Sequence, residues 1–304
     1  MIYTVTLNPA LDYNLYLENM TEGEVNRVKK SALCFGGKGI NVSYVLKELG
    51  AETTALGFVA SFTGEHLEKS LEEAGINTDF IHLKSGMTRI NVKIKAQKET
   101  DLNATGPDID KESLSKLTDK ISLLNSEDIL CLSGSVPKNC DEDIYSRIME
   151  ITTEKGIKTV VDAEGKLLLN CLKYKPFLVK PNAAELEGIF ETRISGEKDI
   201  IKHATKLYQM GAQNVVVSCG KDGAFLVCEQ GIFKAASPKG NAVNTVGAGD
   251  SLVAGFIAAA CKNAPPKESL ALGVAAGSTT AFSETLAKRQ EILDLSAKIG
   301  IIKL

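Results

Sequence analysis

The chain has 304 residues, of which 44% are hydrophobic and 24% are charged, with a formal net charge of −3. This length suffices for a large core in one α/β domain, and the charge gives no reason to expect nucleic acid or an anionic membrane as a partner. No apolar run reaches the ~18 residues of a membrane span. The seven cysteines are scattered without a C-x-x-C pair, which favours free thiols in a reducing cytoplasm over disulfides or zinc.

Six short runs predict buried strands because they are apolar almost throughout and rich in β-branched residues. They are Ile2–Leu7, Thr54–Val59, Ile129–Leu132, Thr159–Val161, Phe177–Val179 and Val215–Val217. Stretches typical of helices lie between most of them, namely Gly39–Leu49, Gly64–Ala74, Asp143–Lys155 and Lys198–Met210. Strands that alternate with helices predict an α/β fold whose parallel sheet is covered on both faces.

Two segments depart from this rhythm, because polar and apolar residues alternate along Asp12–Glu18 and Thr88–Lys95. Period-2 alternation predicts strands of a sheet with one apolar face, and Val25–Cys34 is a candidate for a further strand of it. In the second segment the apolar face holds Ile90, Val92 and Ile94, and the other face holds Arg89, Asn91, Lys93 and Lys95.

We expect these strands to form a small separate sheet that projects as a lid from a single domain spanning residues 1–304. The lid would be built from two insertions, at about residues 12–34 and 87–104. Its apolar face needs a cover, which is either the substrate cleft or the same lid of a second chain. The second possibility favours a homodimer.

Polar side chains follow five of the predicted strands directly. They are Asn8 and Asp12, Ser133 and Ser135, Asp162, then Lys180, Asn182 and Glu185, and finally Ser218. Each taken alone is an ordinary cap or turn residue. Because the ligand crevice of an open parallel sheet lies at the carboxyl ends of its strands, all five together predict a polar site at that edge.

Two glycine-rich segments lead into helix-like runs. They are Gly36-Gly37-Lys38-Gly39-Ile40-Asn41 and Asn244-Thr245-Val246-Gly247-Ala248-Gly249-Asp250. The N–H groups in the first turn of a helix lack partners and attract anions. The Asp250 carboxylate beside such an anion could take a proton from a hydroxyl that attacks a phosphoryl group; the alternative is an ordinary tight turn. Neither segment matches the P-loop or the dinucleotide fingerprint, which disfavours a P-loop NTPase and an oxidoreductase.

Asn182-Ala183-Ala184-Glu185 places an amide and a carboxylate three residues apart at a predicted helix start. One carboxylate together with nucleotide phosphates suits Mg²⁺. The same spacing is also that of a capping box, in which Glu185 reaches back to the helix start. Both interpretations stay open, and one motif can do both jobs.

Over nearly its whole length the chain resembles the ribokinase/PfkB family of carbohydrate kinases. The resemblance depends on the two glycine-rich segments, with Asn182-Ala183-Ala184-Glu185 and Ser218-Cys219-Gly220-Lys221-Asp222-Gly223 in the expected order between them. Leu7-Asn8-Pro9-Ala10-Leu11-Asp12 and Thr88-Arg89-Ile90-Asn91-Val92 resemble the branch of the family that acts on phosphosugars. The resemblance implies a three-layer α/β/α core around a mostly parallel central sheet, with a small β-sheet lid.

The resemblance also implies roles for individual residues. Asp250 would be the catalytic base, and the amides of Gly247, Ala248 and Gly249 would hold the transferring phosphoryl group. The sugar would be held by Asp12, Gly37, Lys38, Asn41 and Arg89, with Asn103 and Ser135 as weaker candidates. The ATP site would include Lys180, Asn182, Ser218, Gly220, Gly223 and Ser278, with Glu185 near Mg²⁺.

The reaction that this resemblance implies is ATP-dependent phosphorylation of a ketose phosphate, foremost of fructose 1-phosphate to fructose 1,6-bisphosphate. Tagatose 6-phosphate and fructose 6-phosphate are alternative substrates, and a non-catalytic sugar-phosphate sensor is an alternative from another class. Lys38 with Arg89 is the predicted pair for the phosphate that the sugar already carries. Many members have Asp where this chain has Asn244, and that acidic position helps to hold a monovalent cation, so the resemblance does not decide whether potassium activates this chain.

Overall fold

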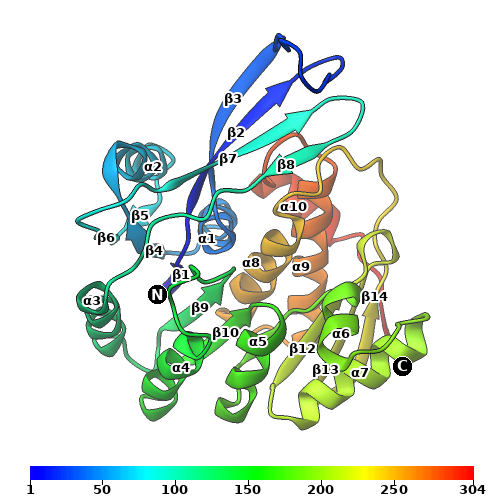
Figure 1. Cartoon of the computed structure of the whole chain (residues 1–304). Helices are drawn as coiled ribbons and strands as arrows, with labels where there is room; N and C mark the ends of the chain where they lie inside the picture. The colour runs from blue at the N-terminus through cyan, green and yellow to red at the C-terminus, as the bar shows by residue number, and fades with distance from the viewer.

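A computed structural model describes all 304 residues, and a sheet of eleven strands runs through its centre (Figure 1). In spatial order the strands are β15 (Ile301–Lys303), β14 (Gly231–Ala235), β13 (Ala224–Cys228), β12 (Asn214–Ser218), β11 (Leu178–Val179), β10 (Lys158–Asp162), β9 (Ile129–Ser133), β1 (Ile2–Thr6), β4 (Thr53–Val59) and β5 (Asn77–Thr78), with β6 (Ile81–His82) also on β4. All pairs from β12 to β5 are parallel, and β13 to β15 add an antiparallel edge. The mostly parallel central sheet is therefore confirmed.

Helices cover both faces of this sheet, as continuous apolar strands require. One face carries α3 (Lys111–Ser122), α4 (Ile144–Glu154), α5 (Gly165–Cys171), α6 (Ala183–Phe190) and α7 (Glu197–Gln209), and the other carries α1 (Lys38–Glu48), α8 (Ala248–Ala260), α9 (Pro266–Ala281) and α10 (Arg289–Ser296). Within β9, Leu130 packs into the first layer and Cys131 into the second. Successive side chains thus enter opposite cores, and the three-layer α/β/α architecture is confirmed.

The six predicted strands and four predicted helices are all present, with ends shifted by up to three residues. The antiparallel edge and the helices α3, α9 and α10 were not among the elements singled out from the sequence. None of the helices combines the length and the apolar character needed to cross a bilayer.

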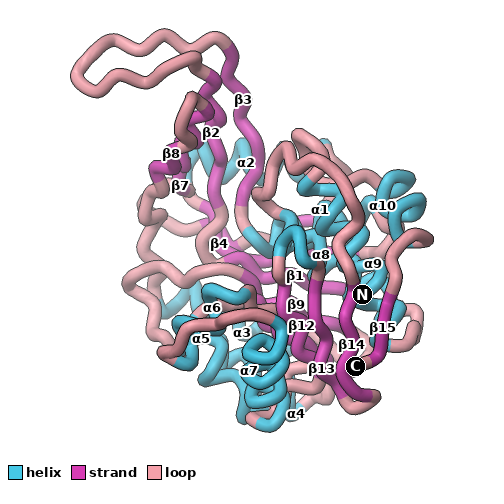
Figure 2. The backbone as a smooth tube through the Cα atoms, turned by 90° about the vertical axis from the view of Figure 1, so that its right-hand side faces the viewer, coloured by secondary structure: helices cyan, strands magenta, loops and turns pink.

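A second sheet of four strands projects from the core, and Figure 2 shows its long tip loop standing clear of the helices. Its order is β3 (Lys30–Gly36), β2 (Ala10–Tyr16), β7 (Arg89–Lys95) and β8 (Thr100–Leu102). Helix α2 (Ser61–Glu73) packs at its base with Leu11 and Phe80. The strand expected over Val25–Cys34 begins only at Lys30, because the preceding residues form the tip loop.

The register of this projecting sheet separates an apolar face from a polar one. Leu33, Tyr13, Val92 and Leu102 stand side by side across the four strands. The next row along β7 lies on the opposite face and holds Asn14, Lys93 and Asp101. Since neighbouring rows of a sheet point to opposite sides, the polar face can line a site while the apolar face points away from it.

Candidate active site

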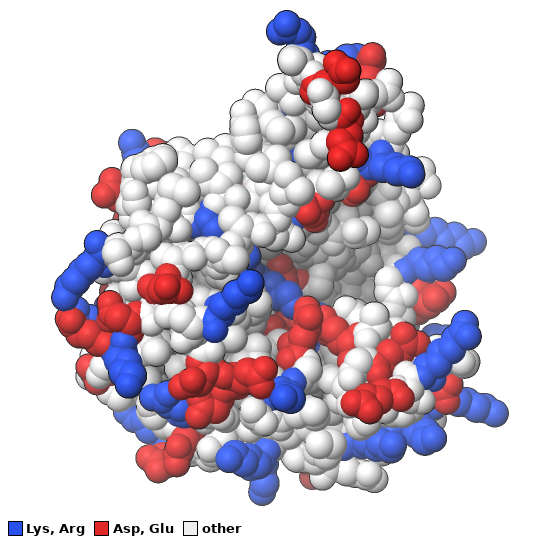
Figure 3. Space-filling model, in the orientation of Figure 1, with Lys and Arg blue, Asp and Glu red and all other residues white.

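A cavity of about 590 Å³ lies between the projecting sheet and the carboxyl ends of the central strands. Figure 3 shows it as a hollow with charged side chains inside it. Val246 is the single hydrophobic residue among the 22 that line it. Such a lining suits a small ligand rich in hydroxyl and charged groups, and it excludes an apolar ligand.

Most of the residues proposed from the sequence meet in this cavity. The lining includes Asp12, Gly37, Lys38, Asn41, Arg89, Asn103, Ser135, Lys180, Asn182, Glu185, Ser218, Gly247, Gly249 and Asp250. They come from both sheets and from the starts of three helices. The fold therefore brings together groups that lie far apart in the sequence.

The start of helix α8 forms one wall of the cavity. Gly247 occupies the N-cap position with φ of +78°, a left-handed conformation that favours glycine. The N–H groups of Gly247, Gly249 and Asp250 have no acceptor in the chain. Such free donors at a helix start create a site for an anion. The N–H of Ala248, by contrast, donates to the carbonyl of Thr245 at 3.2 Å.

Asn244 shapes the bend before this turn. Its Oδ1 accepts a hydrogen bond from the Val246 N–H at 3.1 Å, and its Nδ2 donates to the Glu284 carbonyl at 3.3 Å. The side chain therefore has a local structural task, typical of an Asn that stabilises a turn. It joins the turn to the segment that follows α9.

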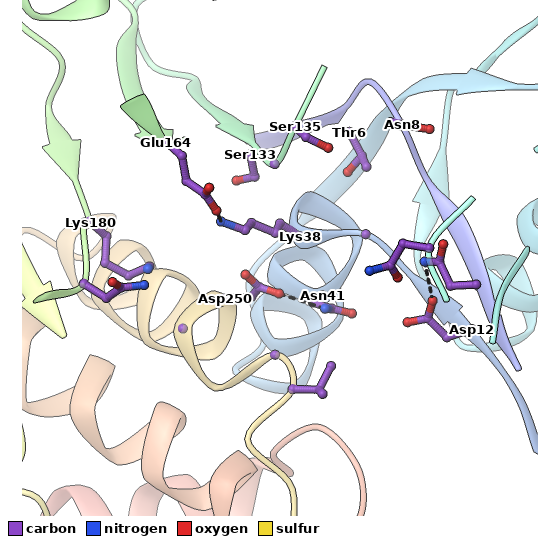
Figure 4. A pocket seen from close by; sticks show the side chains of 18 of the residues that line it. Thr6, Asn8, Asp12, Lys38, Asn41, Ser133, Ser135, Glu164, Lys180 and Asp250 are labelled. Carbon is purple, nitrogen blue, oxygen red and sulfur yellow. Dashed lines mark hydrogen bonds and ion pairs between the residues drawn. The ribbon is translucent and has the colours of Figure 1, made fainter. Parts of the chain in front are cut away.

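Asp250 lies at this turn and is only 6% exposed. Its Oδ2 accepts a hydrogen bond of 2.8 Å from Asn41 Nδ2, as Figure 4 shows. Burial, with a further contribution from nearby Asp162, raises the pKa of Asp250 to about 6, against the lowering effect of Asn41, Lys180 and Lys38. A carboxylate with a pKa in this range can accept a proton near neutral pH more readily than an ordinary Asp.

Two lysines share one buried carboxylate next to Asp250. Asp162 Oδ1 lies 3.3 Å from Lys180 Nζ and 3.7 Å from Lys38 Nζ. Lys38 also lies 3.9 Å from Glu164 and points toward it in Figure 4. Burial disfavours the Lys38 ammonium, but the surrounding carboxylates outweigh burial and raise its pKa. This wall of the cavity therefore holds two lysines that are paired with buried Asp162 beside Asp250.

Glycines in the early loop allow helix α1 to start close to strand β1. Gly37 is the N-cap, with φ of +127°. A Cβ at Gly39 would stand 2.5 Å from Thr6 Oγ1 and 3.0 Å from the Val5 carbonyl oxygen. Any side chain there would push α1 away from β1. The two glycines therefore fix the positions of Lys38 and Asn41 in the cavity.

Asn182 and Glu185 form a capping box at the start of α6. The Glu185 N–H donates to Asn182 Oδ1 at 2.8 Å, and the Asn182 N–H donates to Glu185 Oε2 at 2.9 Å. Both residues also line the cavity, and burial raises the pKa of Glu185. The structural interpretation of this motif is thus confirmed, and Glu185 Oε1 accepts no hydrogen bond within the chain.

Arg89 and Asp12 occupy the side of the cavity formed by the projecting sheet. The Arg89 guanidinium donates to the carbonyls of Ala104 and Asn8 at 3.1 and 3.0 Å, and its Nε is buried without a partner. Asp12 Oδ1 accepts from Asn91 Nδ2 at 2.8 Å. These contacts hold both side chains in place before any ligand binds.

Four of the proposed residues are not in the lining of this cavity: Ala248, Gly220, Gly223 and Ser278. Ser278 is buried within α9, and Gly220 and Gly223 lie in the turn after β12. A Cβ at Gly223 would stand 2.0 Å from the Ala235 carbonyl oxygen. That contact alone accounts for the glycine at this position.

Several lining residues were not proposed as site residues: Thr6, Asn8, Asn91, Lys93, Ser133, Gly134, Glu164 and Val246. Buried Asp162, which joins the two lysines, was noted only as following a strand. The signal for Asn91 and Lys93 was present, because they share a strand face with Arg89. Asn8 and Ser133 were noted as polar residues that follow predicted strands, and Val246 lies within the second glycine-rich segment. Nothing local distinguishes Thr6, Gly134 and Glu164.

Comparisons with known proteins point to one family. Residues 5–291 match the pfkB family carbohydrate kinase profile. The chain is 42% identical to a 1-phosphofructokinase of Bacillus subtilis and 37% identical to a D-tagatose-1-phosphate kinase of Bacillus licheniformis, each alignment covering 100% of both chains. The crystal structure of Escherichia coli phosphofructokinase-2 with fructose-6-phosphate superimposes with a TM-score of 0.92, at 27% identity and 98% coverage of each chain.

Proposed function

Because the chain belongs to the pfkB family of carbohydrate kinases, we propose that this kinase transfers the terminal phosphoryl group of ATP to fructose 1-phosphate and makes fructose 1,6-bisphosphate. One observation carries the proposal. A buried carboxylate, Asp250, stands in a polar cavity beside three backbone N–H groups without acceptors. A base next to an anion site is what phosphoryl transfer to an alcohol needs.

In the proposed reaction Asp250 takes the proton from the sugar hydroxyl as its oxygen forms a bond to the terminal phosphorus of ATP. The bond between that phosphorus and the bridging oxygen breaks, and ADP leaves with the electron pair. The free N–H groups of Gly247 and Gly249, with Lys38 and Lys180, would stabilise the charge spread over the phosphoryl oxygens. The Ala248 amide is left out of this set because Thr245 occupies it.

The sugar would lie between Asp250 and the projecting sheet. Asp12 and Asn41 offer carboxylate and amide groups to its hydroxyls, and Gly37 allows its close approach. The nucleotide would extend from Lys180 toward Asn182 and Ser218 on the other side. The projecting sheet would act as a lid that excludes water, so that ATP is not hydrolysed.

The substrate assignment is tested with a panel of fructose and tagatose 1- and 6-phosphates. Each is incubated with ATP and Mg²⁺, ADP is followed in a coupled assay, and the product is identified by ³¹P NMR. We expect the highest kcat/KM with fructose 1-phosphate. If none of the four sugar phosphates speeds the formation of ADP over the rate without sugar, the proposal is refuted. That result would favour the non-catalytic sugar-phosphate sensor.

Tagatose 1-phosphate is the second candidate substrate. The observation that favours it is the 37% identity to the tagatose-1-phosphate kinase over both full chains. The two sugars differ in the configuration of one hydroxyl, so discrimination depends on few contacts. A higher kcat/KM for the tagatose compound would transfer the assignment to it.

The chemistry of the site suits Mg²⁺ near Glu185. No group of three or more His, Cys, Asp or Glu side chains forms a metal site. Mg²⁺, however, commonly uses one carboxylate together with substrate phosphates and water. Glu185 Oε2 caps α6, while Oε1 is free for such a role. When bound there, Mg²⁺ would neutralise charge on the ATP phosphates.

Glu185→Gln is expected to raise the Mg²⁺ concentration for half-maximal turnover by about 10-fold or more. The amide keeps an oxygen for the Asn182 N–H but loses the charge that attracts the cation. Titration of turnover with Mg²⁺ at fixed ATP measures this, with Glu187→Gln on the same helix as the control. An unchanged Mg²⁺ requirement would remove Glu185 from the proposed site.

We also propose that the projecting sheet joins two chains into a homodimer through its apolar face. In the row that crosses the sheet, Leu33 is 45% exposed, Tyr13 is 36% exposed and Leu102 is 55% exposed. The cavity is lined by residues of the opposite face, so the substrate cannot cover this row. Contiguous exposed apolar groups of this kind are typical of an interface.

Leu33→Glu is expected to convert the dimer to a monomer. Each of the two chains would bring one charged Glu into the interface, where it would be buried against apolar side chains. Gel filtration with light scattering at micromolar concentration measures the mass. Leu123→Glu is the control, because Leu123 is 83% exposed at the end of α3, away from the projecting sheet. A wild-type chain that is already monomeric at this concentration would contradict the proposed interface.

A further inference from the structure

The proposed function leaves one charge unassigned, namely the phosphate that the ketose already carries. The cavity contains four cationic side chains: Lys38, Arg89, Lys93 and Lys180. They form two groups. Lys38 and Lys180 share Asp162 beside Asp250, while Arg89 and Lys93 lie on strand β7 of the projecting sheet.

Lys93 is held firmly in the wall of the cavity. Its Nζ donates to Asp101 Oδ2 at 2.8 Å and to Asn103 Oδ1 at 3.2 Å, and its side chain is only 13% exposed. Asp101 lies directly across from it on β8. A lysine ammonium has three donors, so one N–H remains for a ligand. The ammonium is therefore already positioned before the ligand arrives.

Lys38 is in a different position. Its neighbours are the carboxylates of Asp162 and Glu164. In Figure 4 the Lys38 side chain extends toward Glu164, and Asp12 lies on the opposite side of the picture. The Asp12 side of the cavity belongs to the projecting sheet, where Asn91 bonds Asp12. Arg89, Asn91 and Lys93 follow one another on one face of β7, which leads away from the core.

Resting on the proposed function, we infer that Lys93, together with Arg89, binds the phosphate that the sugar carries, and that Lys38 serves the phosphoryl group in transfer. A ketose 1-phosphate has its phosphate and its reacting hydroxyl at opposite ends. With the hydroxyl at Asp250 and the ring hydroxyls at Asp12, the phosphate reaches along β7. The free N–H of Lys93 is the donor available to it, and the Arg89 guanidinium adds a second positive charge on the same strand.

This assignment differs from the pair predicted from the sequence, which joined Lys38 with Arg89. Lys38 follows two glycines at a helix start, so the sequence marks it as an anion ligand without saying which anion. Lys38 shares the Asp162 carboxylate with Lys180. Since Lys180 is proposed to contact ATP, Lys38 would lie on the ATP side of the cavity. Lys93 and Arg89 together would therefore make the site selective for phosphorylated sugars.

Steady-state kinetics of Lys93→Met with fructose 1-phosphate tests the inference. We expect KM for the sugar phosphate to rise by roughly 10- to 150-fold, the usual loss for a hydrogen bond between charged groups. We expect kcat to stay within about threefold and KM for ATP to stay unchanged, because chemistry and nucleotide binding do not use Lys93. Lys93→Arg should restore most of the affinity.

The matched control is Lys95→Met. Lys95 is two residues further along β7, pairs with Glu99 at 2.9 Å and does not line the cavity. Its loss removes the same charge from the same strand and should leave KM for the sugar phosphate unchanged. Lys93→Gln is a second variant, with the same expected rise in KM, should the Met variant not fold.

The possible outcomes separate the inference from the proposed function. A wild-type chain that turns over no ketose phosphate refutes the function before any variant is compared. If the wild type is active and the Lys93 variants keep a wild-type KM, the inference is refuted while the function stands. A large rise in KM for the sugar phosphate in Lys38→Met, with kcat retained, would also refute it and support the pair predicted from the sequence.

Discussion

Asp250→Asn is expected to lower kcat by roughly 10²–10⁴ while KM for the sugar phosphate changes little. The amide has nearly the same shape, and its oxygen can still accept the hydrogen bond from Asn41. It cannot accept the proton of the attacking hydroxyl, so the sugar binds without efficient transfer. Release of ADP under saturating substrates measures kcat, and the dependence on fructose 1-phosphate measures KM.

Stability provides the control for this variant. The pKa of Asp250 in the folded chain is raised to about 6 by burial, above the ordinary value of 3.8. The stability that comes from its neutral form is therefore present below about pH 4 and is lost as pH rises through about 6. At pH 7 the neutral Asn should keep or raise the melting temperature. Turnover within a fewfold of wild type would remove Asp250 from the role of base.

The same carboxylate should control the acid side of the pH profile. The base must be ionised, so kcat/KM of the wild type should fall about tenfold per pH unit below about pH 6. In Asp250→Asn the residual activity should lose this limb. A wild-type profile that stays flat down to pH 4.5 would contradict the raised pKa or the role of Asp250.

The second large effect is expected for Lys38→Met, with a fall in kcat of roughly 10²–10³, the usual loss for one preorganised charge-stabilising group. Lys38 is one of the cations that lower the pKa of Asp250, and it lies 3.7 Å from Asp162. Its removal should therefore also move the acid limb of kcat/KM to higher pH. Steady-state kinetics between pH 5 and 8 measures both changes.

Lys47→Met is the matched control, since Lys47 lies near the other end of helix α1 and pairs with Glu48 at 3.4 Å. It removes a lysine from the same helix outside the cavity, and wild-type kcat is expected. An acid limb that moves to lower pH in Lys38→Met would contradict the electrostatic reasoning, because loss of a cation can only make the carboxylate harder to ionise.

The sequence by itself determined the architecture. Continuous β-branched runs such as Ile129–Leu132 predict strands buried on both faces, and the structure places alternate residues of β9 in the two cores. Period-2 alternation over Thr88–Lys95 predicts a sheet with one polar face, and β7 has it. Strand burial and the two faces of a strand depend on the order of residues that are adjacent in the sequence, so the local pattern of apolar and polar residues suffices to predict them. Glycines at helix starts likewise predict free N–H groups, and at the start of α8 those of Gly247, Gly249 and Asp250 have no acceptor.

Only the tertiary structure decided how the charges are distributed. Asn41 and Asp250 are 209 residues apart, yet their side chains meet at 2.8 Å. Asp162 becomes part of the site because packing places Lys38 and Lys180, which come from other elements, within 3.7 Å of its carboxylate. From the sequence, Lys38 was predicted to bind a phosphate, whereas Lys93 was noted only as a residue on the polar face of its strand. Which anion each one serves depends on the carboxylates that it faces, and those distances are set by the packing of helices and sheets.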